Sequence, residues 1–127
     1  MAKKLSIIFT TAFLLNLVWE NLHYVHYVHY KGGEITQFIL LRATLFDAVF
    51  ITLLAILFIK FAYFRDRKWY ALPIGIVVAI LIELFALQTG RWAYNEFMLV
   101  IPLINTGLTP TIQLGTLSYL IFKWYIK

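Results

Sequence analysis

The sequence predicts an all-α integral membrane protein in which residues 1–127 form a single four-span domain, a four-helix bundle. Three observations support this fold class. Of the 127 residues, 62% are hydrophobic and only 13% are charged, which is typical of a membrane protein. Four apolar segments have the length of a membrane span or come close to it. The basic residues lie at the ends of these segments, where topogenic residues are found.

The basic residues also predict that the N-terminus and the C-terminus are both cytoplasmic. Both ends of the chain and the loop around Arg65 are rich in Lys and Arg, as cytoplasmic segments are. The opposite side would hold only Lys31 and Arg91. These positions account for the net charge of +5, so we expect no binding to nucleic acid. We expect a multi-pass protein of a bacterial or archaeal cell membrane.

The first predicted helix runs from about Leu5 to Tyr30. Its basic start and apolar run resemble a signal peptide, but no small-residue cleavage site follows, so we interpret it as an uncleaved span. With an advance of ~100° per residue, its polar side chains fall on one stripe within ~80° and should face other helices. The stripe consists of Asn16, Glu20, His23, Tyr27 and Tyr30.

Three further spans follow. Lys31-Gly32-Gly33-Glu34 predicts a turn, and the second helix then runs from about Thr36 to Tyr63. The third runs from about Tyr70 to Thr89, and the fourth from about Thr111 to Tyr125. Because Pro102, Gly107 and Pro110 interrupt the region before the fourth helix, residues 92–109 should form a broken, interfacial or re-entrant segment.

Three acidic residues inside the predicted spans mark the candidate site. With a rise of ~1.5 Å per residue, Glu20, Asp47 and Glu83 fall in one layer between the midplane and the outer leaflet. Carboxylates are costly in hydrocarbon and usually mark a function. His23 lies one turn from Glu20 and could form an acid–base pair with it. We therefore expect Glu20, Asp47, Glu83 and His23 to be catalytic; hydrogen bonding between helices is the structural alternative.

Further polar and aromatic residues at the same level should bind the substrate. We expect Arg42 to pair with Glu20 or Glu83, and the residues after Glu83 to line the mouth of a cavity. The expected set is Asn16, Trp19, Arg42, Gln88, Arg91, Trp92, Tyr94, Asn105 and Gln113.

We expect no cofactor and no metal site. Histidines 23, 26 and 29 are three residues apart, so they advance ~300° at each step around a helix and cannot easily face one ion. There are no cysteines, which removes thiolate ligands.

Asn16-Leu17-Val18-Trp19-Glu20, together with Asp47, resembles the start of the transmembrane terpene cyclases. These enzymes protonate an isoprenoid double bond or epoxide with carboxyl groups inside the membrane. The resemblance implies that Glu20 donates the proton and that Asp47 is its partner. It covers the first third of the chain, and that family has more spans than four. The remainder, including Arg91-Trp92-Ala93-Tyr94, resembles small bacterial membrane proteins.

The expected function is an intramembrane enzyme that acts on a lipid or isoprenoid by carboxylate acid–base chemistry in the outer half of the bundle. Two alternatives stay open: an accessory or structural membrane subunit, and a proton- or cation-coupled small transporter. The expected partners are membrane lipids and a lipophilic small molecule. Self-association or a partner membrane subunit is also possible, because four spans are few for such a site.

Overall fold

The computed structural model describes residues 1–127 as a mostly helical chain. The elements are α1 (Ala2–His23), a 3₁₀ turn (Tyr24–His26), β1 (Tyr27–Tyr30), α2 (Gln37–Lys60), α3 (Ala62–Arg65), a second 3₁₀ turn (Lys68–Tyr70), α4 (Ala71–Gln88), β2 (Trp92–Tyr94) and α5 (Leu108–Tyr125). Three helical segments are long and apolar enough to cross a membrane: Ala2–His26, Gln37–Lys60 and Lys68–Gln88. They correspond to the first three expected spans and indicate a membrane protein.

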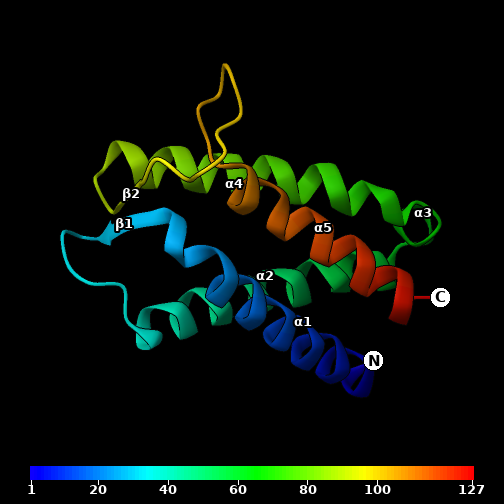
Figure 1. Ribbon diagram of the computed structural model, residues 1–127. Coiled ribbons are helices and arrows are strands. Elements are labelled where there is room, and N and C mark those ends of the chain that lie inside the picture. Colours follow the sequence, from blue (N-terminus) through cyan, green and yellow to red (C-terminus); the bar gives the residue numbers. More distant parts are fainter.

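The four long helices lie side by side with a clear polarity from end to end. Both termini and α3 lie at one end, while β1 and β2 lie toward the other (Figure 1). Helix α1 packs against α2 and α5, and α4 packs mainly against α5. The basic loop after α3 is therefore at the same end as the termini, and the polar residues near Glu83 are toward the opposite end.

On helix α4 (Ala71–Gln88), small residues face inward and large apolar residues face outward. On α4 the buried positions include Ala71, Gly75 and Ala79, at a spacing of four residues, whereas Leu81 and Phe85 are exposed. A Cβ added at Gly75 would meet the backbone of Gly115 on α5, so these two helices touch through their backbones. The outer surfaces of the helices are thus suited to lipid and the contacts between helices to close packing.

The half of the bundle near the termini is filled with apolar side chains. A continuous cluster of thirteen buried hydrophobic residues includes Ile8, Ile51, Phe58, Ile121 and Phe122. Phe58 and Phe122 are in contact, with ring centroids 4.9 Å apart. Buried polar side chains lie instead toward the other half, among them Asn16, His23, Glu83, Thr111 and Gln113.

The expected first helix to Tyr30 is wrong, and the mostly helical fold also contains a small two-stranded sheet. Helix α1 ends at His23, and Tyr27–Tyr30 pairs in antiparallel orientation with Trp92–Tyr94. The aligned partners are Tyr27 with Tyr94 and Tyr30 with Trp92. Alternating Tyr, Val and His favours a strand once a pairing partner is present. That partner lies more than sixty residues later, so the local apolar pattern could not reveal it.

A hairpin-shaped loop joins β2 to α5 and projects sideways from the helices (Figure 1). Val100 pairs with Gly107, and the N–H groups of Ile101 and Leu108 donate to carbonyls across the hairpin. Its tip carries Leu103, which has a left-handed backbone (φ 75°) and is 98% exposed. This hairpin occupies the position of the expected interruption before the fourth helix.

Candidate functional site

A cavity of about 430 Å³ lies at the end of the bundle that carries the small sheet, away from the two termini. It is lined by residues from α1, α2, α4 and α5 and from the segment around β1. All four expected catalytic residues, Glu20, His23, Asp47 and Glu83, line it. Its volume is in the range of sites for small organic ligands. Three acidic residues from three helices therefore meet at one void.

Gln113 of α5 connects two of the acids. Its side-chain nitrogen lies 3.2 Å from Glu20 Oε1, 3.0 Å from Asp47 Oδ2 and 2.9 Å from Asn16 Oδ1. The Asn16 amide nitrogen donates to the Ala12 carbonyl at 2.7 Å, which fixes its oxygen toward Gln113. Residues of α1, α2 and α5 are thus joined at one amide group.

This network has fewer hydrogens than acceptors. The Gln113 amide carries two hydrogens, and the Asn16 oxygen can only accept, so it takes one of them. The remaining hydrogen must serve two carboxyl oxygens. Glu20 and Asp47 therefore compete for one N–H donor at this amide.

Glu20 and His23 form an i, i+3 contact at the end of α1. Glu20 Oε2 and His23 Nε2 are 2.9 Å apart, and the two side chains are only 12% and 5% exposed. The other ring nitrogen, Nδ1, lies 3.1 Å from the Thr109 hydroxyl at the start of α5. His23 is therefore held at both nitrogens, and it can exchange a proton with Glu20 without leaving its position.

Two tyrosine hydroxyl groups of the small sheet donate hydrogen bonds to Glu83. Tyr27 donates to Glu83 Oε1 at 3.2 Å, and Tyr94, its aligned partner on β2, donates to the same oxygen at 2.5 Å. The Tyr94 oxygen accepts in turn from the Gly107 N–H at 2.9 Å. Burial and the adjacent Glu83 carboxyl raise the pKa of both phenols above the usual value, so both remain donors at neutral pH.

Aromatic rings form the cavity wall beside these groups. Trp92 lines the cavity, stacks on Tyr30 with centroids 6.3 Å apart and meets the edge of Tyr27 at 6.0 Å. Its indole N–H has no hydrogen-bond partner. These ring faces attract positive charge.

Several expected binding residues are not brought to the cavity. Gln88, Arg91 and Asn105 are exposed and do not line it; Arg91 lies over the Phe85 ring instead. Trp19 packs on the apolar cluster. The expected pairing of Arg42 with Glu20 or Glu83 is wrong, since Arg42 forms no ion pair. Arg42 does line the cavity, but it sits near the start of α2, above the layer of the acids.

Sequence reasoning missed other lining residues. Tyr24, His29 and Tyr30 line the cavity because the chain leaves the helix after His23 and turns across its end. The alternation of His and Tyr was the available signal, but it was interpreted as a helix surface. No group of three or more His, Cys, Asp or Glu side chains forms a possible metal site.

Comparison of the chain with models of protein families, with curated proteins and with solved structures finds no match. The chemical interpretation therefore depends on the geometry described above.

Proposed function

We propose that this chain is an intramembrane enzyme that transfers a proton to a lipid or isoprenoid substrate and later takes one back. The main support for the proposal is a contact between three helices. Glu20 on α1 and Asp47 on α2 both lie within hydrogen-bonding distance of the Gln113 amide on α5, and all three residues line the cavity. With too few hydrogens for its acceptors, this pair holds one proton between its two carboxyl groups.

The reaction that suits this arrangement is acid-catalysed rearrangement. The Glu20–Asp47 pair gives its proton to a substrate double bond or epoxide oxygen, and a carbocation forms. The faces of Trp92 and Tyr27 and the carboxyl group of Glu83 stabilise that positive charge. Loss of a proton from the cation to the ionised pair completes an isomerisation or cyclisation, so no other reactant is consumed. His23 can equilibrate the pair with water.

The proposed topology is a four-helix bundle with four spans, both termini in the cytoplasm and the hairpin before α5 re-entering the outer leaflet. Helix α5 is not among the three segments that are long and apolar enough to cross a membrane, but its polar residues Thr111, Gln113 and Ser118 are buried against its neighbours and avoid lipid. The first arm of the hairpin and most of its tip, residues 97–104, are apolar, which suits hydrocarbon. The proposed location is a bacterial or archaeal cell membrane.

The same geometry bears on the alternative functions. The apolar cluster around Phe58 and Phe122 fills the cytoplasmic half, so no polar path continues from the acids to that side. This favours a closed pocket over a transporter. The proposed roles of Glu20 and Asp47 agree with the resemblance to transmembrane terpene cyclases. An accessory subunit would need the same polar contacts for stability only.

Deuterium transfer from solvent tests the proposal. The purified chain in liposomes in D₂O is incubated with linear polyprenyl alcohols and their terminal epoxides, and mass spectrometry detects deuterium in carbon-bound positions. We expect incorporation that depends on the protein and falls by about 10²-fold or more in Glu20→Gln and Asp47→Asn. Thr10→Val, which removes an exposed hydroxyl bonded only to the Ser6 carbonyl, is the control. Equal incorporation in protein-free liposomes would overturn the proposal.

A further inference from the structure

The polar groups at the mouth of the cavity differ in kind from those at its floor. Tyr24, His29, Tyr30 and Arg42 line the mouth, at the level where α1 ends and α2 begins. The floor is formed by the acids and Gln113, one or two helical turns deeper. No acidic residue lines the cavity at the mouth.

Each side chain at the mouth has a hydrogen to donate for which the chain supplies no acceptor. Neither the Arg42 guanidinium nor the hydroxyls of Tyr24 and Tyr30 make a hydrogen bond. The Gly32 N–H donates to His29 Nδ1 at 3.0 Å, so the neutral ring carries its hydrogen on Nε2. The mouth is therefore a set of free donors.

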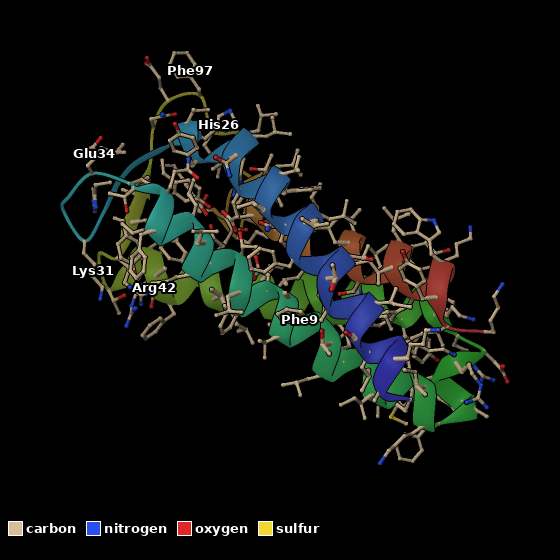
Figure 2. The ribbon with its side chains drawn as sticks, turned by 90° about the horizontal axis from the view of Figure 1, so that it is seen from below. Phe9, His26, Lys31, Glu34, Arg42 and Phe97 are labelled. Atoms are coloured by element: carbon tan, nitrogen blue, oxygen red, sulfur yellow. The ribbon has the colours of Figure 1, made fainter.

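Arg42 adds an uncompensated positive charge to these donors. Its guanidinium lies 6.0 Å from the centre of the Phe38 ring and has no carboxylate within ion-pair distance. Figure 2 shows Arg42 toward the same end of the molecule as Lys31 and Glu34, well away from Phe9 in the apolar half. A planar guanidinium with free N–H groups suits two oxygens of one phosphate or carboxylate.

The cavity also lies between two helices that are not closely packed on each other. Helices α1 and α2 pack together, as do α4 and α5, but α2 and α4 make few contacts with each other. Both nevertheless line the cavity, through Ile39, Ala43 and Phe46 on α2 and Ile82 and Glu83 on α4. Residues of α2 and α4 thus face the same cavity although the two helices are little packed against each other.

The mouth of the cavity carries free donors and a positive charge, whereas its floor carries acids. We infer that the substrate is an amphiphile with a single chain and an anionic head group, a phosphate or a carboxylate. Arg42 and the neighbouring donors hold the head group, and the chain passes the Glu20–Asp47 pair. This inference rests on the proposed function, because it assigns the substrate class of the same site.

Binding of matched amphiphiles tests the inference. The full chain in phosphatidylcholine nanodiscs is titrated with hexadecyl phosphate, palmitate or hexadecanol, and bound amphiphile is quantified by native mass spectrometry. We expect the phosphate and the carboxylate to bind about tenfold more tightly than the alcohol, as a charge-assisted contact implies. Arg42→Gln should abolish this preference. Arg91→Gln, which alters an exposed arginine that does not line the cavity, should keep it.

Three results would overturn the inference: equal binding of hexadecanol, an unchanged preference in Arg42→Gln, or full competition by inorganic phosphate, which would assign the site to a free anion. Tyr30→Phe provides a second variant and should weaken phosphate binding while leaving alcohol binding unchanged. Glu20→Gln should keep the preference. The binding assay and the deuterium assay therefore test separate claims. Deuterium transfer without Arg42-dependent binding would contradict the inferred substrate class but leave the proposed proton transfer in place.

Discussion

Replacing Gln113 by leucine should destabilise the chain more than any other change of similar size. Leucine keeps most of the volume but removes the amide that lies within 3.2 Å of Asn16, Glu20 and Asp47 oxygens. The amide can serve two of these three acceptors at a time. Each buried acceptor left without a partner costs about 1–3 kcal/mol, which gives about 2–6 kcal/mol in total. We expect the lower half of that range, because the two carboxyl groups can turn toward each other.

The free energy of unfolding can be measured by titrating SDS into mixed micelles and following helix content by circular dichroism. Gln88→Leu is the matched control, since Gln88 is exposed and makes no side-chain hydrogen bond. It should change stability by less than about 0.5 kcal/mol. If Gln113→Leu behaved like this control, Gln113 would not organise the acids, and the reasoning about the shared proton would lose its basis.

Three further predictions concern the fold around the site. Gly75→Ala should lower the free energy of unfolding by about 1–3 kcal/mol in the same assay, because the new methyl group would meet the Gly115 backbone. Gly33→Ala is the control and should be nearly neutral, because its Cβ would meet only one atom, at 3.7 Å. Equal effects of the two substitutions would contradict the close approach of α4 and α5. The chain has no cysteine, so Leu103→Cys and Glu34→Cys can each carry one environment-sensitive dye in liposomes. The dye at position 103 should emit as in hydrocarbon and be quenched by brominated acyl chains, and the dye at position 34 should not; water-like emission from both would refute the re-entrant hairpin. Tyr94→Phe should cost about 1–3 kcal/mol, more than Tyr27→Phe, because the Tyr94 hydroxyl also accepts from Gly107; a larger loss for Tyr27→Phe would contradict this order.

The helices could be predicted from the sequence because each is encoded locally. Long apolar runs with basic ends gave the first three spans within a few residues, apart from the end of α1. Helical rise alone predicts that Glu20, Asp47 and Glu83 have similar depths. All three do line one cavity.

Contacts between distant segments could not be predicted. Nothing near Tyr27 indicates that it pairs with Tyr94, and that pairing ends α1 early and directs both phenols at Glu83. The rotation of each helix about its own axis could not be predicted from the sequence either. Gln113 was expected only at the cavity mouth, yet it lies at the centre of the acid network, while Gln88 and Arg91 on the preceding segment point away.

The sharing of one proton by Glu20 and Asp47 inside the membrane is the claim on which the proposed chemistry depends. Infrared spectroscopy of the reconstituted chain at neutral pH can detect it directly, because a protonated carboxyl group has a C=O band that shifts in D₂O. We expect such a band in the wild-type chain and its loss or displacement in both Glu20→Gln and Asp47→Asn. A spectrum without a band that responds to these two variants would show that the pair holds no proton to donate.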